Sequence, residues 1–306
     1  MLETGKFIAK FTIKEICLVF LPVKSDFTTG FIGLFINMQS GMQLRDQLDG
    51  SIPNSVLCHL SNRYDVIGDI AVLRLHPELH IYRHTIAHAI ISWRRNIKTI
   101  LNKTTKLDGE NRTAHYECLA GADTTTLHHE YGYSYRLDVC TVFFNPRLAT
   151  ERKRVTDQVQ PGEKVLVPFC GAGPFVIPAA ARGADVVAVE QNTKACRWFE
   201  KNCILNRVHD CITLIEGDAF DTSHLPIHTF DRAIIPTPYG MDRIIDTIVP
   251  VVRLGGMIHF YTFKNRAQSE QLARELEKNG LMVAIRRRCG NVAPGVSRWV
   301  FDLRKN

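Results

Sequence analysis

The chain has 306 residues, of which 45% are hydrophobic and 23% charged, with a formal net charge of +7. These proportions are typical of a folded globular protein and exclude a collagen-like or largely disordered chain. No apolar run in the sequence approaches the roughly 20 residues of a membrane-spanning helix, so we expect no membrane partner.

Cysteine spacing and basic charge narrow the class of protein further. The nine cysteines show neither C-x-x-C spacing nor a zinc-type Cys/His group, which predicts free thiols, a reducing cytoplasmic compartment and no bound metal. Basic residues cluster at 94–95, 151–154 and 286–288. Each cluster alone is more typical of a solvated face than of an RNA contact, although the positive excess is compatible with a polyanionic partner.

The first half of the chain predicts a small domain behind a weakly specified N-terminal segment. Residues 1–55 contain short apolar bursts broken by polar turns, with a buried strand expected at 16–23. Residues 56–145 predict a small α+β domain with one helical face. Its expected elements are a strand at 66–75, a helix at 84–97 and strands at 113–119 and 133–142.

The second half predicts a larger α/β domain. A linker at 146–160 leads into residues 161–306, where strand and helix patterns alternate as in a parallel sheet covered by helices. The expected strands begin at 165 and lie at 186–189, 212–216, 231–235 and 256–263, with helices at 194–206, 241–252 and 268–279. Two last strands, 283–288 and 298–303, are expected to form an antiparallel hairpin.

A glycine turn in this second domain is the most informative feature. The apolar run VLVPF from Val165 ends in Gly171-Ala-Gly173, which opens a helical pattern, and the next apolar run ends on Glu190. This is the first half of a nucleotide-binding α/β unit. The glycines let the backbone approach a ligand, and the Glu190 carboxylate can accept hydrogen bonds from two ribose hydroxyls.

Two ligands fit such a unit, a dinucleotide and S-adenosylmethionine. A dinucleotide requires a third glycine for its pyrophosphate, and that position is Val176. S-adenosylmethionine has no phosphates, and Asp218, after the next apolar run, can accept from its adenine amine. A lone glycine turn is common in α/β proteins, but it does not account for Glu190 and Asp218 at successive strand ends. The pattern therefore favours S-adenosylmethionine.

Five ordered motifs carry a family resemblance. They are YDVIGDIAVLR from Tyr64, GENRT from Gly109, LAG from Leu119, FNPRLATER from Phe144 and GAGPFVIP from Gly171. Together they resemble the archaeal and eukaryotic tRNA (guanine-37, N1)-methyltransferase family, whose close cousins are the wybutosine-pathway aminocarboxypropyltransferases. The resemblance runs from about residue 60 to the C-terminus and does not extend to the family's N-terminal tRNA-contacting module.

The resemblance implies a fold, a cofactor and a partner. The fold is α/β, a class I methyltransferase Rossmann-like domain preceded by a small α+β domain. The cofactor is S-adenosyl-L-methionine, and the partner is the anticodon loop of tRNA, bound by a monomer. Because guanine N1 carries a proton, its methylation requires a base, and Glu151 matches the family base. Arg112 matches the arginine that binds the O6 side. Without the resemblance, Glu151 would read as a helix-start carboxylate favoured by the helix dipole.

The resemblance also assigns the remaining site residues. The expected cofactor-binding residues are Phe169, Gly171, Gly173, Glu190, Asp218, Ala219 and Arg152. The expected substrate pocket consists of Phe143, Pro236, Thr237, Pro238 and Tyr239.

Three departures from the family pattern leave the acceptor open. The acid usual before the glycine turn is replaced by Val167-Pro168, the Asn-x-Pro asparagine by Pro236, and an aromatic hydroxyl by Phe143. The alternatives are methyl transfer to another RNA base or a protein side chain, aminocarboxypropyl transfer, or RNA binding without catalysis. Glu151 argues against aminocarboxypropyl transfer, and Glu190 with Asp218 argues against a decayed pocket.

Overall fold

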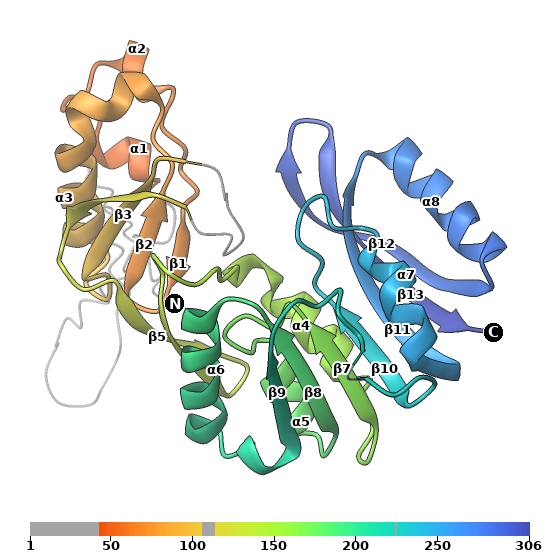
Figure 1. Ribbon diagram of the computed structural model, residues 1–306. Coiled ribbons are helices and arrows are strands. Elements are labelled where there is room, and N and C mark those ends of the chain that lie inside the picture. Colours follow the sequence, from red (N-terminus) through yellow and green to blue (C-terminus); the bar gives the residue numbers. More distant parts are fainter. Residues whose placement is uncertain (1–42, 106–113, 224) are drawn as a thin grey trace, which may run out of the picture.

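The computed structural model describes residues 43–105, 114–223 and 225–306 (Figure 1). The strand expected at 16–23 and the arginine expected at the substrate, Arg112, lie outside the described residues. The described chain forms a small domain at one end and a large α/β domain at the other, with helix α4 between them. No helix in these ranges is long and apolar enough to cross a bilayer.

The small domain is a four-stranded sheet packed against helices. Its strands are β1 Asp65–Ile67, β2 Ile70–Leu73, β3 Thr99–Lys103 and β4 Tyr116–Ala120, in that spatial order. Its helices are α1 Leu44–Gln47, α2 Asn54–Leu57, the 3-10 helix η2 Pro77–Tyr82 and α3 Arg83–Trp93. Apolar side chains of α1, α3 and the sheet form one core. Residues from 43 onward thus belong to this domain, although we expected it to begin at 56.

The single strand expected at 66–75 is two antiparallel strands, β1 and β2. The chain reverses at Gly68, whose φ is 58°. A side chain there would also meet Thr126 and the backbone of Leu127. Glycine is therefore required both by the turn and by the close approach of the neighbouring strand.

A two-stranded hairpin joins the small domain to the large one. It consists of β5 Thr125–Glu130 and β6 Tyr133–Asp138, of which we expected only the second strand. Helix α6, Thr193–Leu205, contains Asn202 and is capped at its C-terminus by Asn206. Both asparagine side chains form hydrogen bonds to the backbone of β6. The hairpin therefore packs with the large domain rather than ending the small one. The expected linker at 146–160 contains the 3-10 helix η3 Pro146–Leu148 and helix α4 Ala149–Thr156.

The large domain has a seven-stranded sheet in the order β12-β13-β11-β10-β7-β8-β9. Its strands are β7 Lys164–Pro168, β8 Asp185–Glu190, β9 Ile212–Glu216, β10 Phe230–Ile235, β11 Val252–Lys264, β12 Leu281–Ala293 and β13 Val296–Lys305. Its other helices are α5 Val176–Ala180, α7 Ile244–Ile248, α8 Arg266–Lys278 and the 3-10 helices η4 His209–Cys211 and η5 Val249–Val251. The strands β7 to β11 are parallel, and β12 and β13 form the expected antiparallel hairpin.

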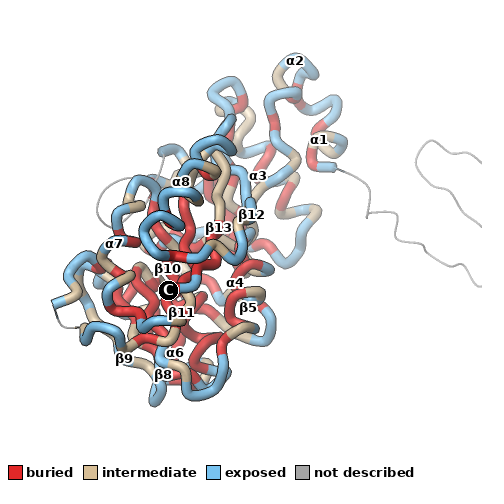
Figure 2. The backbone as a smooth tube through the Cα atoms, turned by 90° about the vertical axis from the view of Figure 1, so that its right-hand side faces the viewer, coloured by how far each residue is buried: buried red, intermediate tan, exposed pale blue. Residues whose placement is uncertain are grey.

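Alternating residues of the central strand face two separate cores. Val165 and Val167 of β7 pack with α4, α5 and α6, whereas Leu166 packs with α7 and α8. The sheet is thus covered on both sides, as its continuous apolar strands predict, and Figure 2 shows the buried strands inside an exposed shell. Strand order reverses between β7 and β10, and the carboxyl ends of strands at such a point form the ligand site of open α/β sheets.

Candidate active site

The glycine turn after β7 and the carboxylate after β8 are held together by hydrogen bonds. The Gly171 N–H donates to Glu190 Oε2 at 2.8 Å, and the Asn192 N–H donates to Oε1 at 2.9 Å. Burial raises the pKa of Glu190, while these main-chain bonds oppose the rise. No cationic side chain in the described chain pairs with Glu190. Each oxygen therefore keeps a lone pair that can accept a ribose hydroxyl.

The two glycines of the turn have different tasks. A side chain at Gly171 would have only the Phe143 carbonyl oxygen near it, at 3.9 Å, so the backbone is open to a ligand. A side chain at Gly173 would meet the Phe199 ring at 2.6 Å. Both residues have positive φ, 56° and 92° respectively. Gly171 thus fits close approach to a cofactor, whereas Gly173 allows α6 to pack against the turn.

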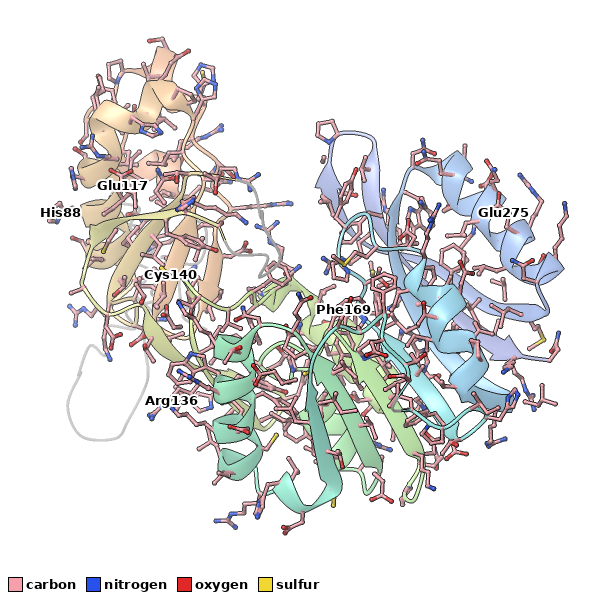
Figure 3. The ribbon with its side chains drawn as sticks, in the orientation of Figure 1. His88, Glu117, Arg136, Cys140, Phe169 and Glu275 are labelled. Atoms are coloured by element: carbon pink, nitrogen blue, oxygen red, sulfur yellow. The ribbon has the colours of Figure 1, made fainter. Side chains whose placement is uncertain are left out.

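Asp218 follows β9, the strand next to β8, and this places it beside the glycine turn. The Gly217 N–H donates to the Glu190 carbonyl oxygen at 2.9 Å, and Asp218 is exposed. Its Oδ1 accepts from the Phe220 N–H, which leaves Oδ2 for an adenine amine. The ring of Phe220 contacts that of Phe169, with 6.3 Å between centroids, and Figure 3 shows Phe169 at the carboxyl ends of the strands. The next residue, Ala219, is buried.

Arg152 has partners other than those we expected. Its guanidinium pairs with Glu130 of β5, donates to the Asn145 carbonyl oxygen and lies over the Phe144 ring. The side chain is 2% exposed. These contacts join α4 to the β5–β6 hairpin. The expected contact of Arg152 with the cofactor stays a prediction. The sequence pattern could not reveal this pair because Glu130 lies on a strand that we did not expect.

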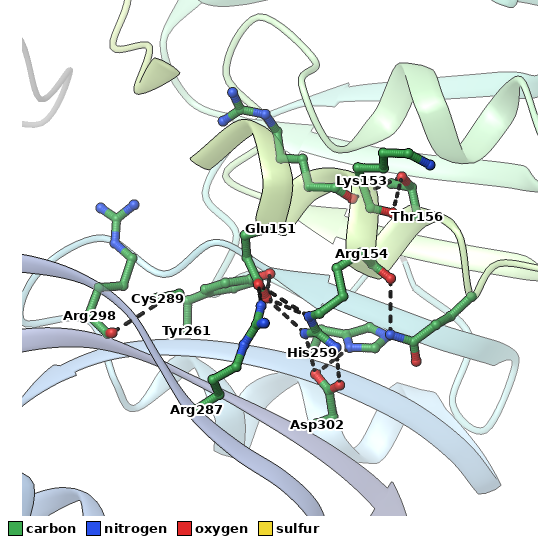
Figure 4. A network of polar contacts seen from close by, with 12 residues as sticks. Glu151, Lys153, Arg154, Thr156, His259, Tyr261, Arg287, Cys289, Arg298 and Asp302 are labelled. Carbon is green, nitrogen blue, oxygen red and sulfur yellow. Dashed lines mark hydrogen bonds and ion pairs between the residues drawn. The ribbon is translucent and has the colours of Figure 1, made fainter. Parts of the chain in front are cut away.

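Glu151 is buried beneath three donors. The Tyr261 hydroxyl of β11 donates to its Oε1 at 3.0 Å, and Arg154 donates to both oxygens at 2.8–3.1 Å. Arg287 of β12 forms an ion pair with Oε2 (Figure 4). Two guanidinium groups and a hydroxyl thus fix the orientation of the carboxylate. The Tyr261 ring also packs at a tilt against that of Phe175, which follows the glycine turn, with 5.5 Å between ring centroids.

Behind Glu151, a chain of polar contacts crosses the sheet. Arg154 donates to both oxygens of Asp302 at 2.6 and 3.0 Å, and His259 Nδ1 lies 2.7 Å from Asp302 Oδ1. Arg232 lies 2.7 Å from His259 Nε2 and pairs with Glu163. Because arginine can only donate, His259 accepts at Nε2 and carries its proton on Nδ1. The chain therefore fixes the position of Arg154, and through it that of Glu151.

Burial and charge perturb the two titratable groups in the middle of this chain. Burial lowers the pKa of His259, although Asp302 opposes the effect. Burial alone would raise the pKa of Asp302, but hydrogen bonds from His259 and Arg154 hold it well below its usual range. The arrangement is thus a neutral histidine beside an ionised aspartate.

The expected substrate pocket divides into buried and exposed parts. Phe143 and Tyr239 are 42% and 61% exposed, which suits a rim that a large substrate can reach. Thr237 is buried and donates its hydroxyl to the Ile235 carbonyl oxygen at 3.2 Å. Pro238 is also buried, and Pro236 is half-buried. Together they form a rigid turn at the end of β10 that offers few donors for a base.

Three site residues were not predicted from the sequence: Tyr261, Arg154 and Arg287. Tyr261 lies in an apolar strand and reads as core, and the two arginines belong to basic clusters more typical of solvated faces. Only their contacts with Glu151, a residue distant in sequence from Tyr261 and Arg287, distinguish them.

Family comparison covers most of the described chain. Residues 126–285 match the TRM5/TYW2 methyltransferase domain, and residues 44–124 match the TYW2 N-terminal domain. The boundary between these matches, near 125, agrees with the packing of the β5–β6 hairpin on α6.

Individual relatives agree with these matches. The chain is 32% identical to tRNA (guanine(37)-N(1))-methyltransferase Trm5b of Pyrococcus abyssi, over 83% of this chain and 78% of that protein. It is 31% identical to a tRNA(Phe) (4-demethylwyosine(37)-C(7)) aminocarboxypropyltransferase of Pyrococcus horikoshii, over 86% and 96% respectively. The crystal structure of P. horikoshii TYW2 in complex with MeSAdo superposes with a TM-score of 0.69, 30% identity and coverage of 85% and 97%. The chain belongs to the TRM5/TYW2 methyltransferase family, which uses S-adenosylmethionine.

Proposed function

We propose that this protein transfers the methyl group of S-adenosylmethionine to N1 of guanine-37 in the anticodon loop of tRNA. The observation that carries the proposal is the Glu151 carboxylate, fixed by Tyr261, Arg154 and Arg287. Tyr261 in turn packs against Phe175, which follows the glycine turn. The Pyrococcus abyssi relative, whose name states this reaction, supports it.

The reaction needs few chemical groups from the protein. When bound, S-adenosylmethionine supplies a methyl group on a positively charged sulfur, so the protein mainly aligns the reactants. We propose that Gly171, Gly173, Glu190, Asp218 and Ala219 hold the cofactor and that Phe169 packs against it. Glu190 would take the ribose hydroxyls, and Asp218 the adenine amine.

Glu151 would accept the N1 proton as N1 forms its bond to the methyl carbon. To do so it must give up a hydrogen bond from at least one of its donors, because a protonated carboxyl group accepts fewer of them. Arg287 is the donor best able to move, since its side chain is 47% exposed. We further propose Arg112 as the donor to O6. Phe143 and Tyr239 would contact the extruded base, and Pro236, Thr237 and Pro238 would shape its pocket.

The decisive test is methyl transfer from labelled S-adenosylmethionine to unmodified tRNA transcripts bearing guanine or adenine at position 37. We expect label only in the guanine transcript, as N1-methylguanosine by nucleoside mass spectrometry. No transfer to the guanine transcript, with cofactor binding intact, would contradict the proposal.

A second candidate is aminocarboxypropyl transfer, favoured by the match of residues 44–124 to the TYW2 N-terminal domain. It predicts no reaction with a plain transcript and addition of the larger group to tRNA carrying 4-demethylwyosine at position 37. Offering both RNAs to the enzyme and weighing the product nucleosides separates the two reactions.

We also propose that the protein acts as a monomer in the cytoplasm. Each of the eight described cysteines is free, which suits a reducing compartment. The exposed rim at Phe143 and Tyr239 needs no second subunit to complete it.

A further inference from the structure

Strand β12 presents its three consecutive arginines to opposite sides of the sheet. Arg287 pairs in register with Val300, and its guanidinium reaches Glu151. Arg286 and Arg288, one position to either side, project from the other face. Arg288 pairs in register with Trp299, and the Arg286 guanidinium lies 5.5 Å from the Trp299 ring centroid. One face of the strand thus contacts the active site, and the other carries two cations beside an indole.

The second face forms a groove of about 770 Å³ between the hairpin and the start of α8. Its polar and aromatic lining consists of Arg266, Arg286, Arg288, Asn291, Ser297 and Trp299. No acidic side chain is among these residues. Glu270, on α8 outside the groove, lies 3.4 Å from both Arg266 and Arg286. Three arginines against one carboxylate leave an excess of two positive charges.

The individual arginines are differently committed. Arg286 is held in place by Ser269, Glu270 and the Trp299 ring. Arg288 is exposed and pairs with no acidic group in the described ranges, and the side chain of Arg266 is 86% exposed. The groove therefore has one fixed cation and two that can reorient toward a ligand.

This chemistry fits the backbone of a nucleic acid. Guanidinium groups bind phosphates in two-pronged fashion, and an indole offers a surface on which a base can stack. An acidic peptide would find the same charges but would have no use for the indole. Arg287, on the reverse of the same strand, contacts Glu151, so the groove and the proposed catalytic base share one hairpin.

We propose that the groove binds phosphates of the tRNA substrate next to the nucleotide held in the active site. The proposal rests on the proposed function for the identity of the RNA. It assigns Arg266 and Arg288 as phosphate-binding residues and Trp299 as a stacking surface, none of them taking part in methyl transfer itself.

The test is the double variant Arg266→Gln/Arg288→Gln, with Arg274→Gln as a control that removes a charge from an exposed position of the same helix outside the groove. We would measure the affinity of the full chain for a tRNA transcript by fluorescence anisotropy at several salt concentrations. The double variant should bind about 10-fold more weakly, and the slope of log K against log salt should fall by about 2. The control should remain within about 2-fold of wild type, and S-adenosylmethionine affinity should be unchanged in both.

The possible outcomes separate this proposal from the proposed function. Wild-type affinity and slope in the double variant, or an equal loss in Arg274→Gln, would overturn the groove. The groove is also overturned if the wild-type chain binds no RNA. If the wild-type chain binds tRNA through the groove but methylates no transcript, the groove stands and the proposed reaction fails.

Discussion

At the scale of single residues, Glu151 faces a conflict between position and reactivity. Tyr261, Arg154 and Arg287 hold its carboxylate in one orientation. The same donors occupy lone pairs of the two oxygens on which a proton would have to be accepted. Arg154 is tied to Asp302, whereas Arg287 is half-exposed. Arg154 on α4 thus holds the carboxylate in place, whereas Arg287 on β12 is the donor that can move away.

Glu151→Gln should lower the rate of methyl transfer about 100-fold or more, because the amide keeps the shape but cannot accept the N1 proton. Affinity for S-adenosylmethionine should change little, since Glu190 lies in a separate hydrogen-bond group. Single-turnover rates and calorimetric titration measure the two effects. Glu117→Gln, which also removes a carboxylate paired with an arginine but lies on β4 of the small domain, is the control and should keep most of the activity. Normal turnover in Glu151→Gln would remove Glu151 as the base.

Alanine substitutions at the two glycines of the turn should have different effects on stability and on cofactor binding. Gly173→Ala should lower the free energy of unfolding by about 2–4 kcal/mol, because its methyl group meets the Phe199 ring and its φ is positive. Gly171→Ala should cost only about 1–2 kcal/mol from its positive φ but weaken cofactor binding, since its methyl group points into open space. Denaturant titration and calorimetry distinguish the two, and equal losses of stability would contradict this division.

At the scale of elements, α6 couples the cofactor turn to the β5–β6 hairpin. The side chain of Asn202 accepts from the Arg136 N–H and donates to the carbonyl oxygens of Arg136 and Ala172. Within the described part of the chain, the Asn206 side chain forms hydrogen bonds to Ser134 of the hairpin and to its own helix. One asparagine therefore reaches the glycine turn and the other does not.

Asn202→Ala should lower the free energy of unfolding by about 2–4 kcal/mol, because a buried side chain is removed and three backbone groups, among them the buried Ala172 carbonyl, lose their partner. It should also reduce affinity for S-adenosylmethionine, since the carbonyl group of Ala172 in the turn is released. Asn206→Ala is the matched control and should destabilise the fold without changing that affinity. An unchanged cofactor affinity in Asn202→Ala would show that α6 does not position the turn.

Elements with strong periodicity were predictable, and those defined by a turn were less so. The strands and helices of the large domain and its terminal hairpin lie where alternating apolar runs indicated. The β1–β2 turn was missed because the residues on both sides of Gly68 and Asp69 are apolar and together resemble one strand. β5 was missed because its residues TTLHHE are largely polar. At α4 the sequence indicated only a weak helix start inside a linker, because its residues are mostly charged. In both elements burial depends on partners distant in sequence.

At the scale of the whole molecule, the site likewise combines features that have a local sequence pattern with pairs that depend on residues distant in sequence. The proximity of Gly171, Glu190 and Asp218 was predictable because the carboxyl ends of neighbouring parallel strands meet at one edge. The pairing of Arg152 with Glu130 and of Arg154 with Asp302 was not, because each joins segments whose proximity depends on the complete fold. Such pairs carry no local periodic signal.

The polar chain from Glu151 to Glu163 ties α4 to β13, β11 and β10, and its histidine should make stability depend on pH. The folded pKa of His259 lies below that of an unfolded histidine, near 6.5. As the pH falls below about 6.5, the unfolded chain binds the extra proton first, so the free energy of unfolding decreases. Asp302, whose pKa is lowered, adds to the loss in the same direction below about pH 4. The midpoint temperature of thermal unfolding should therefore decrease as the pH is lowered from about 7 to about 5.

At about pH 7 the His259→Gln variant should have a lower thermal midpoint than wild type, because Asp302 and Arg232 lose their hydrogen-bond partner. Between about pH 7 and pH 5, however, its midpoint should decrease less than that of wild type. His209→Gln, which alters a histidine with 57% side-chain exposure beside Asp210, is the control and should keep the wild-type slope. Scanning calorimetry of the three proteins at matched ionic strength measures the slopes. Parallel slopes for wild type and His259→Gln would show that His259 titrates as an ordinary histidine, and the polar chain would then be no source of acid sensitivity.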